Sequence, residues 1–398
     1  MTVRAEKPSV NLREKLAELD KPTGIAGEAM LRAETPQEQF NLIGAGRRNL
    51  IINGAMQVAQ RSTSVSVSGS TFSYDSVDRM ELGRSNVDNI VVTSSQATDA
   101  PDGFAYSYKL DVTTAESAIA ADEYYRGLQY TIEGQDLTGI GYGTSNAKPV
   151  TLSFWVKSSR AGTYSVTFYR DESTDRIYST SYTVDAVGVW EYKTITVEAD
   201  TSIPTTADNA GRLSISWHLF AGSNFKGGNI VGWENYSSAT DLAAHHAVDW
   251  GLSTDDYWQI TGLQLELGKV ATPFEHRSYG EELALCQRYY YRIDGRTGYS
   301  ILPTFSAYSA DAAAGAILFP VELRDRPTAL EQSGTAGDYF LTDSSGSGQA
   351  CTSVPTFGGS THKKGASVIM TSTGNVSAGN ASIPTMGANG YLAWSAEL

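Results

Sequence analysis

The sequence has few of the features that stabilise secreted or membrane-embedded proteins. Cys286 and Cys351 are its two cysteines, too few and too far apart for a disulfide framework or a metal cluster. We expect Cys286 to be a buried free thiol. No apolar run approaches membrane-spanning length, and the first residues lack the hydrophobic stretch of a signal peptide. We therefore expect a protein that is made in a cytoplasm and does not insert into a membrane.

Charge is also sparse, at 19% of residues, and it is unevenly placed. Residues 1–48 carry eight Lys and Arg against seven Asp and Glu, while the remainder holds the whole acidic excess of a chain with net charge −14. Nucleic-acid binding needs a basic face that displaces counterions from phosphates, and anionic membranes attract basic segments. The composition therefore argues against both partners.

Recognisable catalytic motifs are missing as well. The stretch that begins at Gly44 starts like a dinucleotide-binding turn but lacks the last glycine, and neither a phosphate-binding P-loop nor a Gly-x-Ser-x-Gly elbow occurs. Five histidines form no His-Glu-x-x-His pair. Glycoside hydrolysis needs two carboxylates a fixed distance apart, and carboxylates such as Asp255 and Asp256 lie near aromatic residues, but among 44 carboxylates such proximity is expected by chance. We expect no enzymatic activity, no cofactor and no metal site.

What the sequence does have is the pattern of a β-protein. Glycine (38) and tyrosine (22) are abundant, and turn signals recur between runs of alternating apolar residues. Within one run, Leu152, Phe154 and Val156 share a face, with Trp155 on the other. The clearest predicted strands are 105–112, 124–132, 150–157, 163–169, 190–197, 213–220 and 258–267. This order predicts a β-sandwich.

Helical patterns lie at two places. In residues 1–48, Asn11 and Thr35 are N-cap candidates for short helices that cannot bury a core alone and need a partner surface. Further on, Ser278 is an N-cap candidate with Glu281 three residues later. The spacing predicts a linking helix over 278–292.

Two long motifs carry a family resemblance. Residues 49–61 read NLIINGAMQVAQR, and residues 258–292 read WQITGLQLELGKVATPFEHRSYGEELALCQRYYYR. Both are similar to motifs that open and close a jelly-roll-like domain in bacteriophage tail-fibre and virion appendage proteins. The strand order also looks like jelly-roll carbohydrate-binding modules, which is an analogy of fold only.

The resemblance implies a virion protein assembled in the host cytoplasm. It further implies attachment to the phage tail or other virion proteins through residues 1–48, a homotrimer, and adhesion to host cell-surface polysaccharide. Three alternatives remain open: a collar or capsid decoration protein without host contact, a bacterial carbohydrate-binding module, and a polysaccharide depolymerase.

The predicted organisation is therefore mainly β. A helical virion-attachment segment (1–48) precedes a jelly-roll-like β-sandwich (49–277), the linking helix (278–292) and a small C-terminal β-domain (293–398). The predicted strands of the last domain are 297–305, 315–322, 338–342, 367–372 and 390–398. Between 332 and 382 the chain is rich in Gly, Ser and Thr, and we expect recognition loops there.

Aromatic residues supply the candidate binding positions. Trp217 and Trp258 fit core strands, whereas aromatic residues in looped or polar segments suit a sugar face or a neighbouring subunit. The receptor-binding candidates are Trp233, Tyr236, Trp250, Tyr308, Tyr339 and Phe357. Leu285, Tyr289 and Tyr290 are candidates for helix bundling at a three-fold axis, with packing of the linking helix as the equal alternative.

Overall fold

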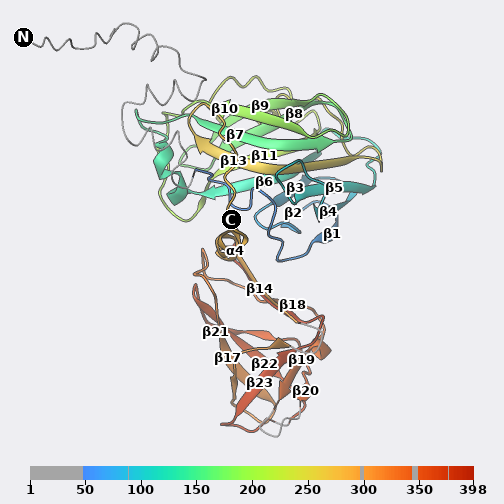
Figure 1. The fold of residues 1–398 in the computed structure, drawn as a ribbon, viewed down its shortest axis with the longest axis vertical. Coiled ribbons are helices and arrows are strands. Elements are labelled where there is room, and N and C mark those ends of the chain that lie inside the picture. The colour runs from blue at the N-terminus through green and yellow to red at the C-terminus, as the bar shows by residue number, and fades with distance from the viewer. Residues whose placement is uncertain (1–47, 88, 296–299, 343–347, 375) are drawn as a thin grey trace, which may run out of the picture. The chain divides into compact units, whose positions relative to one another are not determined.

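The computed structural model describes residues 48–398, apart from 88, 296–299, 343–347 and 375. The predicted helices of residues 1–48 therefore lie outside the described residues, except for Arg48 at their end. From residue 50 onward the chain is one compact unit made mainly of antiparallel strands (Figure 1). The predicted fold class, mainly β with a sandwich of sheets, is confirmed.

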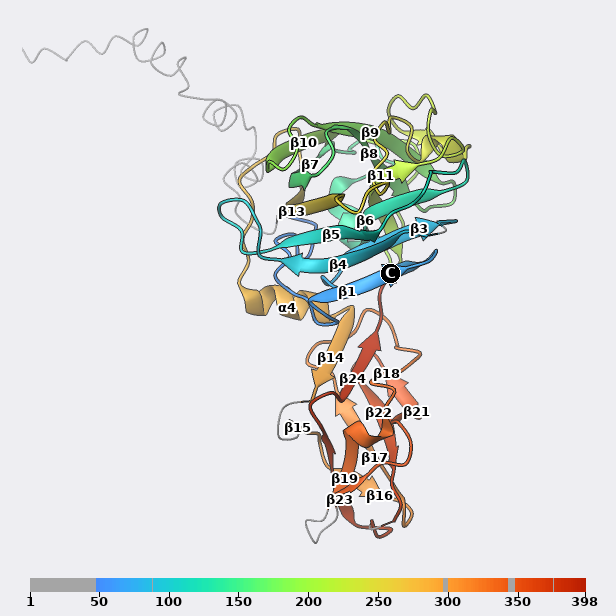
Figure 2. The ribbon, with the colours of Figure 1, turned by 90° about the vertical axis from the view of Figure 1, so that its right-hand side faces the viewer.

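Two antiparallel sheets form the first sandwich. Among the described residues, the six-stranded sheet has the order β1-β4-β5-β13-β7-β10, and the seven-stranded sheet has the order β12-β9-β8-β11-β6-β3-β2. Figure 2 shows β5, β4 and β1 side by side. The strands of the first sheet are β1 (Ser64–Ser68), β4 (Val91–Ala97), β5 (Ser107–Thr114), β7 (Val150–Ser158), β10 (Glu191–Val197) and β13 (Tyr257–Leu267). Those of the second are β2 (Phe72–Tyr74), β3 (Glu81–Ser85), β6 (Tyr124–Glu133), β8 (Gly162–Arg170), β9 (Arg176–Val184), β11 (Gly211–Ala221) and β12 (Glu234–Asn235). Short 3₁₀ turns lie at Gly134–Ile140 and Ala239–Asp241.

Alternation along the strands builds the core between these sheets. Leu152, Phe154 and Val156 of β7 are fully buried, as predicted, and Trp155 is half-buried on the other face. Trp217 and Trp258 are also fully buried, which confirms their assignment to the core. Burying such large side chains stabilises the fold by about 2–3 kcal/mol each.

The linking helix is shorter than predicted. Helix α4 spans Tyr279–Gln287, and the Ser278 hydroxyl accepts a hydrogen bond from the Glu281 amide, as the capping pattern indicated. Residues after Arg288 are not helical: strand β14 (Tyr290–Asp294) pairs with β24 (Tyr391–Ser395). Three consecutive tyrosines fit a pleated ladder better than a helix, and the backbone pairing with β24 decides the outcome. The prediction of a helix over 278–292 is therefore wrong after residue 287.

The C-terminal region contains two further sheets in the described ranges. One has the order β14-β24-β18, and the other has the order β20-β19-β23-β16-β17-β22-β21, with β15 paired to β23. Their remaining strands are β15 (Ser300–Ile301), β16 (Phe305–Ala307), β17 (Ala312–Leu318), β18 (Glu331–Gln332), β19 (Tyr339–Thr342), β20 (Gly348–Ala350), β21 (Thr356–His362), β22 (Gly365–Thr371) and β23 (Ala381–Met386), with a 3₁₀ turn at Ala336–Asp338. About half of the described part of 332–382 is thus strand, so the predicted recognition loops are confined to the connections between these strands.

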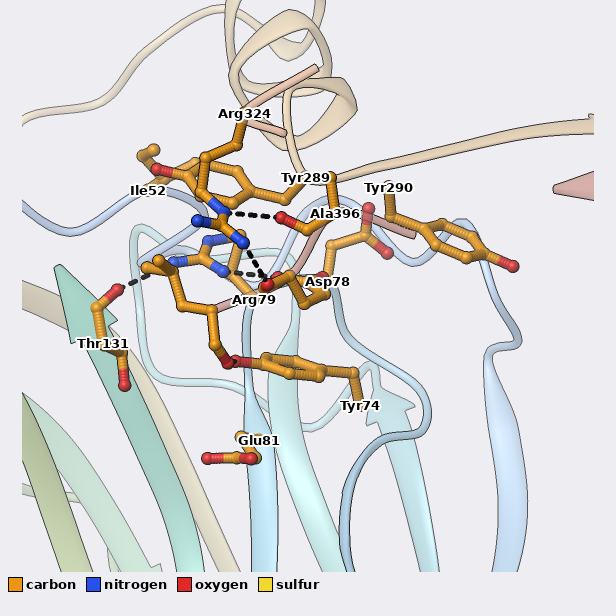
Figure 3. A network of polar contacts seen from close by, with 12 residues as sticks. Ile52, Tyr74, Asp78, Arg79, Glu81, Thr131, Tyr289, Tyr290, Arg324 and Ala396 are labelled. Atoms are coloured by element: carbon orange, nitrogen blue, oxygen red, sulfur yellow. Dashed lines mark hydrogen bonds and ion pairs between the residues drawn. The ribbon is translucent and has the colours of Figure 1, made fainter. Parts of the chain in front are cut away.

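A buried charge network ties the last residues of the chain to the sandwich (Figure 3). The Arg79 guanidinium is 1% exposed; it forms an ion pair with Glu397 and donates to the Thr131 carbonyl at 2.7 Å. Arg324 donates to the carbonyls of Ala396 and Glu397, both at 2.7 Å. These contacts fix residues 396–398 beside β6, where Leu398 reaches the surface hollow described below.

Candidate functional site

A groove with a cavity volume of about 510 Å³ lies on the outer face of the seven-stranded sheet. Strands β3, β6, β8 and β11 form its floor, and Tyr236, Leu242 and Leu398 lie along its margins. Sixteen residues line it: Glu81, Tyr124, Arg126, Gln129, Thr131, Thr167, Tyr169, Asp171, Ala210, Gly211, Ser214, Ser216, His218, Tyr236, Leu242 and Leu398. Charged residues are a minority, and hydroxyl, amide and aromatic groups dominate.

The period of the strands explains this composition. In β11, Leu213, Ile215 and Trp217 point into the core and are fully buried, so Ser214 and Ser216 between them face the groove. His218 faces the groove by the same alternation, two residues after Ser216. The sandwich core thereby dictates a polar floor.

Hydrogen bonds hold the floor in one arrangement. Gln129 donates through Nε2 to Glu81 Oε2 at 2.6 Å and accepts from Ser216 Oγ at 3.0 Å. The hydroxyls of Thr131 and Ser214 lie 2.9 Å apart. Burial raises the pKa of Glu81 above its usual range. A floor already fixed by its own hydrogen bonds loses little entropy when it binds a ligand.

His218 is the unusual group of the floor. It is 2% exposed, and neither ring nitrogen has a hydrogen-bond partner within the described ranges. Burial, followed by the neighbouring charges of Arg126 and His246, holds its pKa well below 6.5. His218 is therefore neutral, with one N–H donor and one acceptor nitrogen to offer. A buried polar group left without a partner costs about 1–3 kcal/mol, so this position favours a ligand that supplies one.

Tyrosine rings flank the floor. The Tyr124 ring packs edge-on against Phe225, with centroids 4.8 Å apart, and Tyr169 packs against Tyr236 at 5.4 Å. The Tyr169 hydroxyl donates to Asp175 Oδ2 at 2.6 Å. Aromatic rings fixed in this way offer rigid faces on which apolar sugar faces can stack.

A buried ion cluster positions the segment that carries Tyr236. Asp200, fully buried, pairs with Arg170 and with Arg176 Nε at 3.2 Å. Arg176 also donates to the Trp233 carbonyl at 2.9 Å and to Asn235 Oδ1 at 2.7 Å. These bonds join the Asp200 cluster to residues 233–236. The cluster thereby supports the segment that contributes Tyr236 to the groove.

Of the predicted receptor-binding residues, Tyr236 is the one that lines the groove. Trp233 is half-buried against Tyr142 and Tyr178, and its indole N–H donates to the Glu198 carbonyl at 2.8 Å. Trp250 is fully buried in the sandwich core, so its prediction as a binding residue is wrong.

The candidates of the C-terminal region differ in exposure. Tyr339 is fully buried, with its hydroxyl donating to the Tyr391 carbonyl at 2.7 Å, so it is not available to a receptor. Phe357 packs against the core of this region, and Tyr308 is 58% exposed. Tyr308 and Phe357 therefore stay candidates, whereas burial rules out Tyr339.

The proposed bundling residues are occupied within their own chain. The Tyr289 ring lies 3.6 Å from the Arg79 guanidinium carbon, and its hydroxyl donates to Glu133 Oε1 at 2.6 Å. Tyr290 is 1% exposed and donates to Glu331 Oε2 at 3.0 Å. Leu285 packs, partly buried, against the sandwich core. The packing alternative holds for the two tyrosines, and they leave no side-chain surface for a partner subunit.

Cys286 and Cys351 are free and buried, and burial raises the pKa of both thiols. Within the described ranges, no group of three or more His, Cys, Asp or Glu residues is placed to hold a metal ion. None of the helices in this part of the chain combines the length and hydrophobicity needed to cross a bilayer.

The buried histidines predict a pH dependence of stability. Burial lowers the pKa of His246 from 6.5 to about 4, so between these pH values the unfolded chain binds a proton that the folded chain does not. Stability is therefore lost as the pH falls from 6.5 to about 4, by roughly 3 kcal/mol for this residue. Asp78 acts oppositely, because burial raises its pKa to about 6 and the folded chain takes up the proton first.

Substituting His246→Gln should flatten this dependence. Urea unfolding at several pH values between 7 and 4 measures it: the variant should lose about 3 kcal/mol less than the wild type on acidification, even if it is less stable at pH 7. If the free energy of unfolding changed with pH by the same amount in both proteins, the pKa of His246 would not differ between the folded and the unfolded chain.

Comparison with solved structures gives matches of low similarity. The enzymatically active domain of tailspike protein 4 from bacteriophage CBA120 is 12% identical, with a TM-score of 0.29, over 55% of this chain and 21% of that chain. A putative sugar binding protein from Bacteroides thetaiotaomicron is 11% identical, with a TM-score of 0.28, over 55% of this chain and 100% of that one. The N-terminal CBM22-1-CBM22-2 tandem domain of Paenibacillus barcinonensis Xyn10C is 9% identical, with a TM-score of 0.28, over 89% and 99%.

These TM-scores are too low for the likeness to bear on what the chain binds. No protein-family model matches the chain, and the search of curated proteins gives no match.

Proposed function

We propose that the chain is a bacteriophage virion appendage of the tail-fibre type, which adheres to glycans on the host cell surface without cleaving them. The groove on the seven-stranded sheet is the observation that carries the adhesive part of this proposal. Its hydroxyl and amide floor can hydrogen-bond sugar hydroxyls, and Tyr124, Tyr169 and Tyr236 can stack on sugar faces. The virion part rests on the motifs at 49–61 and 258–292.

Assembly belongs to the same proposal. Residues 1–48 attach the protein to the tail or to another virion component, and three copies form the fibre. A shallow groove that holds a few sugar units binds weakly by itself. Several copies on one particle multiply such contacts into avidity, provided that the copies can reach the surface together.

Removing two tyrosine rings should abolish most of the binding. We expect Tyr124→Ala with Tyr236→Ala to weaken binding to the purified surface polysaccharide of the host by about 10–100-fold, because each lost stacking contact is worth about 1 kcal/mol or more. Tyr192→Ala is the matched control, since Tyr192 is 45% exposed on β10 of the other sheet. Isothermal titration calorimetry measures the affinities, and circular dichroism checks that both variants are folded.

Two outcomes would contradict the proposal. Unchanged affinity in the folded double variant would exclude the groove as the adhesive site. Release of reducing sugars from the polysaccharide by the wild type would show that the protein is a depolymerase and not an adhesin that leaves the glycan intact. Immunogold labelling of particles tests the virion assignment separately, and we expect label on the tail.

A further inference from the structure

We propose that the groove selects neutral saccharides and discriminates against acidic ones; this rests on the proposed glycan-binding function. The lining holds two carboxylates, Glu81 and Asp171, against a single permanent cation, Arg126. The groove thus has a formal charge of −1, within a chain of net charge −14. The negative groups of uronic acids, sialic acids and sulfated sugars would lie close to this excess negative charge and be repelled by it.

Arg126 is partly engaged by residues of the groove itself. One terminal nitrogen donates to Gln129 Oε1 and the other donates to the Tyr124 hydroxyl at 3.1 Å. Its guanidinium carbon lies 4.8 Å from the ring centroid of Phe72 and 5.1 Å from that of Tyr124. The remaining nitrogen, Nε, is buried. Two of the five guanidinium N–H groups are therefore engaged inside the groove lining, and the buried Nε–H does not face the open groove, so a carboxylate would have to compete with Gln129 and Tyr124 for the terminal nitrogens.

His218 does not supply a second cation. Its burial and the neighbouring Arg126 keep the imidazole neutral, as described above. A neutral imidazole has one donor and one acceptor nitrogen that point in different directions, so it suits two separate sugar hydroxyls, one that accepts and one that donates. An anionic oxygen could use the N–H alone and would leave the acceptor nitrogen unpaired.

The remaining floor has the same character. Ser214, Ser216 and Thr131 carry hydroxyls, and Gln129 carries an amide, so each polar group of the floor matches the mixed donor and acceptor pattern of sugar hydroxyls. An acidic ligand would instead bring its charge beside Glu81, whose carboxyl group is already partly desolvated. Like charges in such a site repel more strongly than in open water.

Calorimetry with the full chain tests this selectivity. The probes are neutral hexasaccharides of glucose, galactose and mannose, and a hexasaccharide of galacturonic acid. We expect the best neutral probe to bind at least tenfold more tightly than the galacturonate at low salt. The gap should narrow as sodium chloride rises to 0.5 M, because screening weakens the repulsion.

A pair of matched variants isolates the charge effect. Glu81→Gln with Asp171→Asn should raise the ratio of galacturonate affinity to neutral-probe affinity about tenfold. Glu322→Gln with Asp325→Asn removes the same two charges from positions that are about half exposed and lie outside the groove lining. This control should change neither affinity.

The outcomes separate this inference from the proposed function. Galacturonate that binds the wild type as tightly as the best neutral probe would overturn the selectivity while leaving the groove as a glycan site. Equal effects of the two charge-neutralising pairs would show that net charge, and not the groove lining, sets the preference. Absence of binding by every probe at millimolar concentration would overturn both the selectivity and the groove.

Discussion

Replacing Arg79 by methionine is expected to lower the free energy of unfolding by about 3–5 kcal/mol. The guanidinium is buried, and it pairs with Glu397, donates to the Thr131 carbonyl and lies against the Tyr289 ring. Methionine fills similar volume but leaves the Glu397 carboxylate, itself 7% exposed, to the single remaining ion pair that the described residues give it, with Arg61 at 3.2 Å. The loss should therefore come mainly from a buried charge with too little compensation.

Urea unfolding followed by tryptophan fluorescence measures this effect. Lys109→Met provides the control, because Lys109 pairs with Asp111 on the surface, where side-chain exposures are 28% and 37%. Such pairs contribute about 0–1 kcal/mol. A loss below about 1 kcal/mol in the Arg79 variant would mean that the network in Figure 3 does not hold residues 396–398 in place.

Replacing Asp200 by alanine should have a comparable effect on stability and a second effect on binding. Its carboxylate is fully buried, and the hydrogen bonds from Arg176 are the main reason that its pKa lies below its usual range despite the opposing effect of burial. Without it, Arg170 and Arg176 lose a shared counter-charge, and we expect a loss of about 3–5 kcal/mol. Because Arg176 also holds Trp233 and Asn235, the loosened segment should displace Tyr236 from the groove.

Measuring both stability and affinity distinguishes a role of Asp200 in the groove from a role in the stability of the whole sandwich. At a temperature where the Asp200→Ala variant is still folded, its affinity for the host polysaccharide should fall at least fivefold. Asp185→Ala, at a side chain that is 74% exposed and pairs with Lys193, should leave stability and affinity unchanged. A destabilised variant with full affinity would show that the cluster supports the sandwich and not the groove.

Much of the sandwich could be predicted from the sequence because strand alternation is visible wherever one face is buried. The apolar positions of β7, for example, mark both the strand and its core face. Strand β9 was not predicted, since its sequence RIYSTSYTV mixes Ser and Thr with tyrosines and has no clear apolar period. Its placement depends on nine paired positions with β8, which no local pattern specifies.

The groove residues show a different limit of prediction from sequence. Tyr236 was found because it lies in a looped aromatic segment, but the same reasoning selected Trp250, which packs against Tyr125 with ring centroids 5.5 Å apart in the core. A tryptophan that lies outside a strand can still pack against a sheet and be buried in the core. The floor residues Gln129, Ser216 and His218 occupy outward positions of β6 and β11. Those positions could be read from alternation, yet only tertiary structure shows that neighbouring strands bring them together.

The end of α4 shows how tertiary pairing overrides a local signal. The capping pattern at Ser278 correctly gives the helix start. Nothing equally local marks its end at Gln287, because the competing interaction is the ladder between β14 and β24, about one hundred residues away.

The central claim is that the groove on the seven-stranded sheet is the glycan-binding site. A crystal structure of the full chain with the tightest-binding hexasaccharide tests it most directly. We expect sugar rings against Tyr124, Tyr169 and Tyr236, with a sugar hydroxyl within hydrogen-bond distance of a His218 ring nitrogen. Sugar density elsewhere, for example at the exposed ring of Tyr308 in the C-terminal region, together with an empty groove, would contradict it.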